Sequence, residues 1–127
     1  MTRVLIIDDE ETICELIKLI LEAEGFEVDT ANDGEEGVDR YCENPADVVI
    51  TDIFMPKKDG IEIMLELQGA MNPIKFIVIS GGGKAGVSLT DVFEAAKEFG
   101  AEYTFAKPFD SNELVAAVKD LASRNGK

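Results

Sequence analysis

Short apolar runs rich in Val and Ile recur along the chain at regular intervals. Val4–Ile7, Val48–Ile50 and Phe76–Ile79 are continuous apolar runs, a pattern typical of parallel strands that are buried on both faces. Phe26–Asp29 instead alternates between apolar and acidic residues, which predicts an edge strand. Tyr103–Ala106 is a weaker fifth candidate. The apolar pattern therefore predicts five strands.

Apolar residues at helical spacing fill the intervals between these runs and predict five helices. Gly25 and Gly100 predict the ends of the first and fourth helices, and Asp59 with Glu62 predicts a capping box at the start of the third. The residues expected to face the core are Ile13, Leu16, Ile17, Ile20 and Leu21 in the first helix, Val38 and Tyr41 in the second, Ile61, Met64 and Leu65 in the third, Leu89, Val92, Phe93, Ala96 and Phe99 in the fourth, and Leu114, Val118 and Leu121 in the fifth.

The order of these elements is strand then helix, five times over. Short buried strands that alternate with helices predict an α/β fold, with one parallel sheet and helices on both of its faces. We expect a single domain over residues 1–127, and no output domain because the chain ends soon after the fifth helix. Gly81–Gly83, with Gly86 following, is interpreted as a loop inside this domain.

Composition narrows the classes of function. The chain has 12 Lys and Arg against 26 Asp and Glu, a net charge of −14, so nucleic acid and anionic membranes are not expected partners. No apolar run is long enough to span a membrane, and the N-terminal run is too short for a signal peptide, so a cytoplasmic location is expected. The absence of His excludes His metal ligands and bases. Cys14 and Cys42 are expected to be reduced thiols in the core.

Polar residues that could bind ions or react follow the predicted strands. Asp8 and Asp9 follow the first strand, Asp52 the third, Ser80 the fourth and Lys107 the fifth. In open α/β sheets, ligands bind beyond the carboxyl ends of the strands, so these side chains are expected to converge. Three carboxylates in a site without His favour a hard cation such as Mg²⁺.

Charge balance supports phosphoryl transfer at this site. The three aspartates carry three negative charges, which one Mg²⁺ and the Lys107 ammonium balance. The same cations would neutralise the oxygens of a phosphoryl group arriving at Asp52, and Ser80 could donate a hydrogen bond to it. Taken singly, Ser80 is also typical of a turn and Lys107 of a protein surface. Glu10 and Glu11 are interpreted as acids that favour the dipole at a helix start.

These residues resemble the response-regulator receiver domain of two-component signalling, over essentially the whole chain. The resemblance implies a flavodoxin-like (βα)5 doubly wound sheet with strand order 2-1-3-4-5. It rests on four motifs, which are Val4–Glu10, Asp52–Pro56 with Asp59 and Gly60 following, Ile79–Ser80, and Lys107–Phe109.

The resemblance also implies a role for each polar residue of the site. Asp52 would be the phosphoacceptor. Mg²⁺ would be bound by Asp9, Asp52 and the backbone carbonyl of Phe54, with Asp8 acting through water. Ser80 would be the switch hydroxyl, and Lys107, which precedes Pro108 in a cis peptide bond, would contact the phosphate. The implied phosphodonor is a sensor histidine kinase, a phosphotransfer protein or a small molecule. A separate downstream protein would bind the face of the fourth helix, fifth strand and fifth helix. Such a domain assists only its own phosphorylation and dephosphorylation and is not an enzyme in the usual sense.

The sequence departs from the family pattern in two places. Thr104 stands where the family usually has an aromatic switch residue, and the flanking Tyr103 and Phe105 are expected on the opposite side of the strand. The loop from Ser80 to the fourth helix is longer than usual. These departures keep open an alternative, a degenerate receiver that acts as a phosphorylation-independent interaction module.

Two other classes of protein fit the sequence less well. A phosphohydrolase with an aspartyl nucleophile generally needs a second acid two residues further on, where this chain has Phe54. A flavodoxin-like cofactor binder needs a phosphate-binding loop after the first strand, where Asp8–Glu11 would repel the phosphate.

Overall fold

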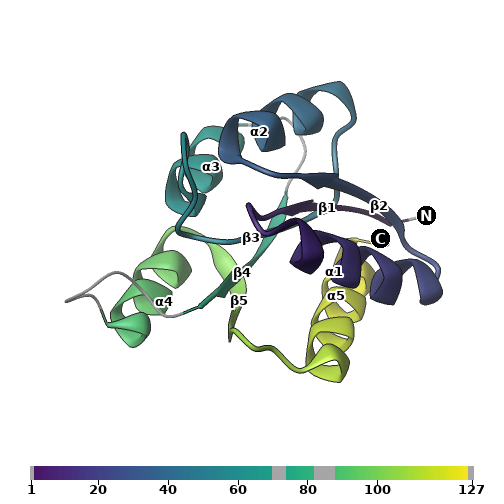
Figure 1. Ribbon diagram of the computed structural model, residues 1–127. Coiled ribbons are helices and arrows are strands. Elements are labelled where there is room, and N and C mark those ends of the chain that lie inside the picture. Colours follow the sequence, from purple (N-terminus) through teal and green to yellow (C-terminus); the bar gives the residue numbers. More distant parts are fainter. Residues whose placement is uncertain (1, 70–73, 82–87, 126–127) are drawn as a thin grey trace.

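The computed structural model describes residues 2–69, 74–81 and 88–125. Strands and helices alternate throughout (Figure 1). In chain order the elements are β1 (Arg3–Ile7), α1 (Glu11–Ala23), β2 (Glu27–Ala31), α2 (Gly34–Glu43), β3 (Val48–Thr51), α3 (Gly60–Leu67), β4 (Lys75–Ser80), α4 (Leu89–Glu98), β5 (Ala101–Ala106) and α5 (Ser111–Asn125).

The strands form one parallel sheet in the order β2-β1-β3-β4-β5, which confirms the predicted fold. The central strands β1 and β3 are buried along almost their whole length, because helices cover both of their faces. Alternation of side chains along β1 divides its residues between two cores: Leu5 and Ile7 pack on one face of the sheet, and Val4 and Ile6 on the other.

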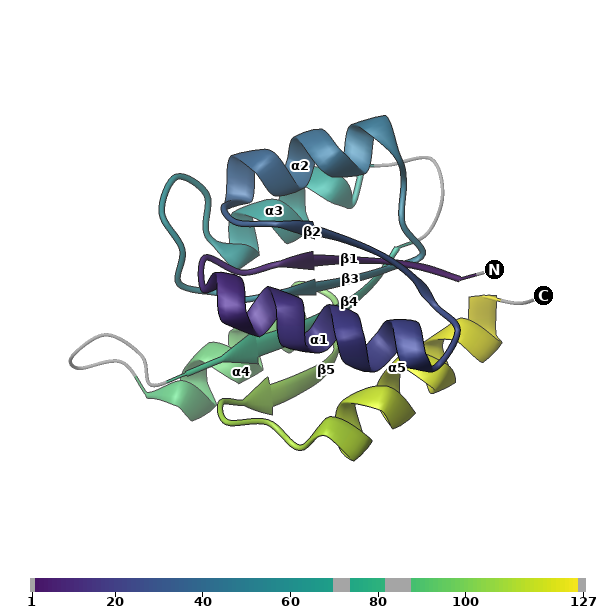
Figure 2. The ribbon, with the colours of Figure 1, turned by 45° about the vertical axis from the view of Figure 1, so that its right-hand side comes forward.

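Each face of the sheet has its own set of helices. Buried residues of α2, α3 and α4, among them Tyr41, Met64 and Ala96, pack on the face of Leu5. Buried residues of α1 and α5, among them Ile17 and Leu114, pack on the face of Val4. Figures 1 and 2 show α1 and α5 together on one side of the sheet and α2 and α3 on the other. The result is a three-layer α/β/α arrangement.

Helix ends follow the predicted local signals. The Asp33 side chain accepts a hydrogen bond from the Glu36 N–H at the start of α2, and Asp59 with Glu62 forms the capping box that was predicted for α3. Gly25 and Gly100 follow α1 and α4 with φ of 94° and 116°, a region that residues with a Cβ rarely adopt. These glycines let the chain leave each helix and enter the next strand.

Several residues predicted to face the core are exposed. Leu16, Leu65 and Phe99 are 46%, 50% and 39% exposed, and Cys42 is exposed rather than in the core. The physical reason is the width of the buried stripe. In α1 only Cys14, Ile17 and Leu21 are fully buried, at spacings of three and four residues, and Leu16 lies about 100° around the helix from Ile17.

Strand boundaries also differ from the prediction in detail. Strand β2 begins at Glu27 rather than Phe26 and extends to Ala31, and β5 begins at Ala101. A register irregularity at Phe76/Ile77 in the β4–β5 pairing accompanies this longer strand. As predicted, Tyr103 and Phe105 lie on one side of β5, where they pack against the core of α1 and α5.

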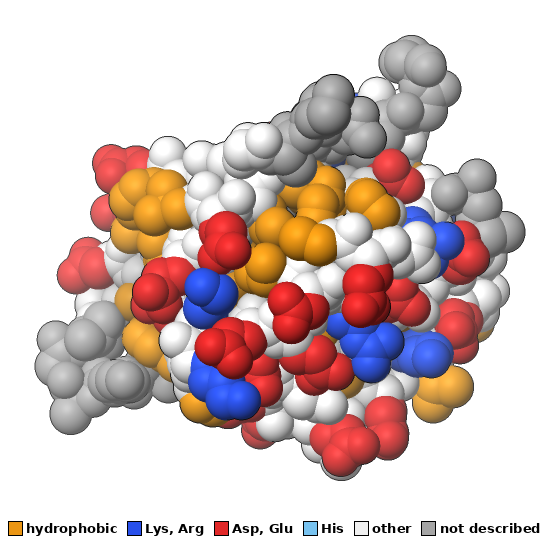
Figure 3. All heavy atoms as spheres, turned by 90° about the horizontal axis from the view of Figure 1, so that it is seen from above, with side chains coloured by type: hydrophobic (Ala, Val, Ile, Leu, Met, Phe, Trp, Pro, Cys, Tyr) orange, Lys and Arg blue, Asp and Glu red, His pale blue; other side chains and the backbone are white. Residues whose placement is uncertain are grey.

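The surface shows how the acidic excess is distributed. Over the face of α2 and α3, carboxylates are widespread, with Lys and Arg between them (Figure 3). Some of these charges pair, as in Arg40–Glu36 and Lys58–Glu66. Within the described residues, no helix is both long and apolar enough to cross a membrane. Most of the predicted Gly-rich loop, at residues 82–87, lies outside the described residues.

Candidate functional site

The register of the central strands places Asp8 and Asp52 side by side. Ile7 of β1 pairs with Thr51 of β3, so the next residue of each strand leaves the sheet at the same edge. The Asp52 N–H donates to the Ile7 carbonyl at 3.0 Å, and the Asp8 N–H donates to the Ala31 carbonyl at 3.1 Å. Backbone hydrogen bonds therefore hold both aspartates at the carboxyl end of the sheet.

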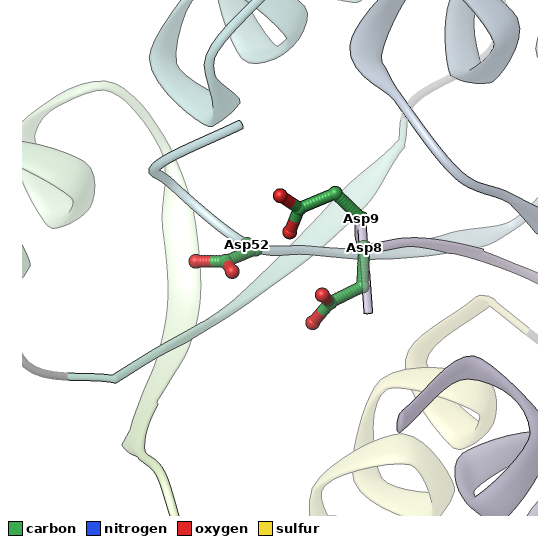
Figure 4. Close-up of side chains that lie close together, drawn as sticks. All are labelled: Asp8, Asp9 and Asp52. Atoms are coloured by element: carbon green, nitrogen blue, oxygen red, sulfur yellow. The ribbon is translucent and has the colours of Figure 1, made fainter. Parts of the chain in front are cut away.

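Asp8, Asp9 and Asp52 form a cluster of carboxylates at this edge. One oxygen from each of the three lies within 4.8 Å of the others, and Figure 4 shows the three groups beyond the strand ends that carry them. Asp8 and Asp52 are only 3% and 7% exposed, whereas Asp9 is exposed. The cluster is thus partly buried and opens to solvent on the side of Asp9.

Lys107 provides the positive charge of the site. Its Nζ lies 2.9 Å from Asp8 Oδ2, 3.1 Å from Asp52 Oδ2 and 2.8 Å from Glu10 Oε1. Gly81 lies against the aliphatic part of this side chain, because a Cβ built at Gly81 would be 3.7 Å from Lys107 Cβ and Cδ. The lysine therefore reaches from the end of β5 into the space between the carboxylates.

Burial and ion pairing act in opposite directions on the pKa values of this site. Burial raises the pKa of Asp8 above its usual value, and the hydrogen bond from Lys107 only partly offsets this effect. Burial alone would lower the pKa of Lys107, but its hydrogen bonds to Glu10 and Asp8 outweigh that cost and raise the pKa. The ammonium is therefore charged at neutral pH and stabilises the carboxylates around it.

Glu10 belongs to this site, and its interpretation as an acid that only favours the helix dipole was wrong. Glu10 occupies the position before α1, but its side chain makes no capping hydrogen bond. Its carboxylate binds Lys107 instead, and its backbone N–H donates to Asp8 Oδ1 at 2.9 Å. A carboxylate directly after Asp8 and Asp9 was the available signal, but helix-start acids are so common that sequence alone favoured the other reading.

Two residues that were not predicted to belong to the site support the backbone of Asp8. The Cys14 thiol and the Asn32 side-chain amide both donate to the Asp8 carbonyl, at 3.3 and 3.4 Å. Burial raises the pKa of the Cys14 thiol to about 11, so this group is a neutral donor at physiological pH. Cys14 is the predicted reduced core thiol, and here it also fixes the first aspartate.

The backbone around Asp52 is equally constrained. The Thr51 hydroxyl donates to the Asp52 carbonyl at 2.8 Å, and the Phe54 N–H donates to Asp52 Oδ1 at 3.4 Å. Gly60, the first residue of α3, packs so closely that a Cβ there would lie 2.4 Å from the Asp52 carbonyl oxygen. The Phe54 side chain is partly buried and packs against the core of α2, α3 and α4.

Within the described residues, neither the Ser80 nor the Thr104 hydroxyl donates a hydrogen bond to the carboxylates of the site. Ser80 is fully buried, its hydroxyl donates to the Gly81 carbonyl at 3.3 Å, and its own carbonyl accepts from the Lys107 N–H at 2.9 Å. Thr104 is half-buried on β5 and pairs with Val78 in the sheet. The Lys107–Pro108 peptide bond is cis.

The donor set of this site fits a magnesium ion. Asp8, Asp9 and Asp52 offer only carboxylate oxygens, which are the ligands that hard divalent cations prefer, and among the described residues no His or Cys joins the cluster. A cluster of carboxylates that could hold a metal ion, with an adjacent ammonium, at the strand ends of a five-stranded parallel α/β sheet, defines a domain of the receiver class.

Comparison with known proteins agrees with that assignment. The model of the response regulator receiver domain family matches residues 4–119, and the chain belongs to this family. It is 37% identical over 124 residues to the transcriptional regulatory protein PrrA of Mycobacterium bovis, covering 98% of this chain and 51% of that protein. It is 31% identical over 127 residues to the response regulator ArlR of Staphylococcus saprophyticus, covering 98% and 54%. The chain thus spans about half the length of these curated relatives.

Solved structures give the same result. A response regulator receiver domain protein from Clostridium thermocellum is 36% identical, with a TM-score of 0.85 over 98% of this chain and 97% of that one. The receiver domain of the Francisella response regulator 1452 is 30% identical, with a TM-score of 0.84 over 98% and 99%. The similarity therefore extends over whole receiver domains.

Proposed function

We propose that this domain is a phosphoacceptor switch in two-component signalling, in which Asp52 receives a phosphoryl group in a reaction that depends on Mg²⁺. The donor is a sensor histidine kinase, a phosphotransfer protein or a small phosphodonor. The observation that carries this proposal is the contact of one ammonium, Lys107, with Asp52 and Asp8 inside a cluster of three carboxylates. Membership of the receiver family supports it.

Each residue of the site has a separate role in the proposed reaction. Asp8, Asp9 and Asp52 would hold the magnesium ion, with the Phe54 carbonyl as a further ligand. When bound, the ion neutralises charge on the phosphoryl oxygens. Lys107 would contact a phosphoryl group on Asp52, which its distance of 3.1 Å from Asp52 Oδ2 supports. Ser80 would donate a hydrogen bond to another of the phosphoryl oxygens.

The transfer itself is a displacement at phosphorus. A carboxylate oxygen of Asp52 attacks the phosphorus and forms a P–O bond, while the bond from phosphorus to the leaving group breaks. From a phosphohistidine the imidazole leaves with the electron pair of the P–N bond, and from acetyl phosphate acetate leaves with that of the P–O bond. A carboxylate nucleophile carries no proton, so the displacement needs no base to activate it. This chemistry requires positioning and charge neutralisation more than acid–base catalysis.

The proposed output is a change of partner affinity. Phosphorylation adds about one negative charge at Asp52 at neutral pH, which favours a conformation in which Ser80 approaches the phosphoryl group. Ser80 ends β4 and pairs with Ala106 of β5, so its movement is coupled to the face of α4, β5 and α5. A downstream protein that binds this face would distinguish the two states.

Intact mass spectrometry tests the proposal. The protein is incubated with acetyl phosphate, with and without Mg²⁺, beside the variants Asp52→Ala and Asp91→Ala. Asp91 is an exposed acid in the first turn of α4 and controls for loss of a carboxylate elsewhere. We expect one phosphoryl mass in the unmodified protein and in Asp91→Ala, only with Mg²⁺, and none in Asp52→Ala.

The alternative function is a phosphorylation-independent interaction module, and Thr104 is the observation that favours it. Without an aromatic side chain at this position, the usual partner of the switch hydroxyl is missing from β5. If the folded protein gains no phosphoryl mass with Mg²⁺ and acetyl phosphate, the phosphoacceptor proposal is overturned and this alternative is favoured. An equal gain in Asp52→Ala would place the acceptor at another residue.

A further inference from the structure

Glu10 differs from the other two carboxylates that bind Lys107. Its side chain is 59% exposed, whereas those of Asp8 and Asp52 are almost completely buried. Its oxygen lies 2.8 Å from Lys107 Nζ, a distance as short as that of Asp8. Yet Glu10 is not one of the three residues whose oxygens gather as a candidate metal cluster. It therefore binds the ammonium without belonging to the metal-binding set.

The site as a whole has to accommodate two cations. Asp8 and Asp52 belong to the metal cluster, and the same two residues hold Lys107. Carboxylate oxygens that coordinate a divalent ion are weaker partners for an ammonium, and the two cations repel each other at short range. Of the three partners of Lys107, Glu10 alone stays available when the metal cluster is filled.

We propose that Glu10 is a positioning residue, which holds the Lys107 ammonium at the site so that a magnesium ion can occupy Asp8, Asp9 and Asp52 at the same time. The inference rests on the magnesium site of the proposed function and extends it to a residue outside that site. With Glu10, four carboxylates face one divalent ion and one ammonium, so each cation keeps at least one carboxylate of its own. Without Glu10, Lys107 competes with the ion for Asp8 and Asp52.

Magnesium binding in the absence of any phosphodonor tests this role. Affinities are measured by isothermal titration calorimetry for the unmodified protein, Glu10→Gln, Lys107→Met and the double variant. We expect Glu10→Gln to weaken magnesium binding about two- to fivefold, the range that a partly exposed ion pair spans. Lys107→Met should strengthen binding, because it removes the competing cation. In the Lys107→Met background, Glu10→Gln should have little further effect.

Glu11→Gln is the matched control. Glu11 carries the same charge one residue further on, in the first turn of α1, and makes no ion pair with any described residue. Its loss should change the affinity less than Glu10→Gln does. Urea unfolding of every variant checks that each is folded, and because Glu10 is exposed, its substitution should leave the fold intact.

Three results would overturn the inference. If Glu10→Gln weakens binding equally with Lys107 and with Met at that position, Glu10 acts by direct attraction of the ion and not through the lysine. If Glu10→Gln binds magnesium as tightly as the unmodified protein, Glu10 has no role in binding. If the unmodified protein binds no magnesium, the metal site of the proposed function fails and the role of Glu10 fails with it.

Discussion

The contact between Gly60 and Asp52 makes Gly60→Ala a sharp test of how tightly the phosphoacceptor strand is packed. A Cβ at Gly60 would lie 2.4 Å from the Asp52 carbonyl oxygen, 3.0 Å from Ile53 Cα and 3.1 Å from the Asp52 carbonyl carbon. All three are backbone atoms, so no side-chain rotation can relieve the overlap. The Gly60 N–H also donates to the Ile53 carbonyl at 2.9 Å, which prevents the start of α3 from moving away without cost.

The expected loss of stability follows from two opposing effects. Overpacking of this kind costs about 1–3 kcal/mol of unfolding free energy. Alanine is favoured over glycine by up to about 1 kcal/mol inside a helix, but Gly60 is the first residue of α3, where that gain is smaller. We therefore expect a net loss of about 2 kcal/mol. With an m-value of about 2 kcal/mol/M in urea, the unfolding midpoint should fall by about 1 M.

Gly69→Ala is the matched control for this measurement. A Cβ at Gly69 would meet only the Glu66 carbonyl oxygen, at 3.9 Å, which is an ordinary contact. Its stability should be unchanged or raised by up to about 1 kcal/mol, because alanine restricts the unfolded chain. Equilibrium urea unfolding, followed by circular dichroism at 222 nm, compares the three proteins. Equal midpoints for Gly60→Ala and Gly69→Ala would refute the argument from close packing at Asp52.

Three further predictions concern the fold. Leu21 is completely buried and Leu19 on the same helix is 68% exposed, so Leu21→Ala should cost about 2–5 kcal/mol of unfolding free energy and Leu19→Ala less than about 1 kcal/mol, measured by urea unfolding. Gly25 has φ of 94° and no atom near its missing Cβ, so Gly25→Ala should cost about 1–2 kcal/mol from backbone strain alone. Burial raises the pKa of Tyr41 above its usual value of 10. The buried neutral side chain therefore stabilises the fold fully below pH 10, and this contribution declines as the pH rises through the raised pKa, because Tyr41 of the unfolded chain ionises first. Tyr41→Phe should therefore lose less stability than the unmodified protein between pH 9 and 11, and identical pH profiles would contradict this.

The sequence predicted the sheet well because its strands are buried on both faces. Continuous apolar runs such as Val4–Ile7 leave few alternatives, and the helices between them fix the parallel order. From that order the positions of Asp8, Asp52 and Lys107 at one edge follow directly, and the structure places them within contact distance. Strand-end position is a backbone property, and the backbone was the part that the apolar pattern determined.

Side-chain partners were harder to predict, since they depend on rotation about helix axes and on rotamers. Leu16 and Ile17 both fit an apolar helical pattern, but the structure buries Ile17 and leaves Leu16 exposed. Glu10 stands at a position typical of acids that start a helix. Its carboxylate is shown to belong to the site only by its contact with Lys107, which lies 97 residues away in the chain. Such long-range pairing leaves only a weak local signal in a single sequence.

The charge of the site includes a fourth carboxylate, Glu10, in addition to the three aspartates. Lys107 lies between Asp8, Glu10 and Asp52, and its ammonium partly offsets the cost of burying the Asp8 carboxylate. A fourth carboxylate makes the site more negative than the balance of three aspartates, one Mg²⁺ and one lysine requires. The extra negative charge lies on Glu10, whose side chain is exposed to water, whereas the buried Asp8 and Asp52 face the cations. On the role proposed for Glu10, the site would accept a divalent ion without displacing the ammonium that the proposed phosphoryl transfer needs.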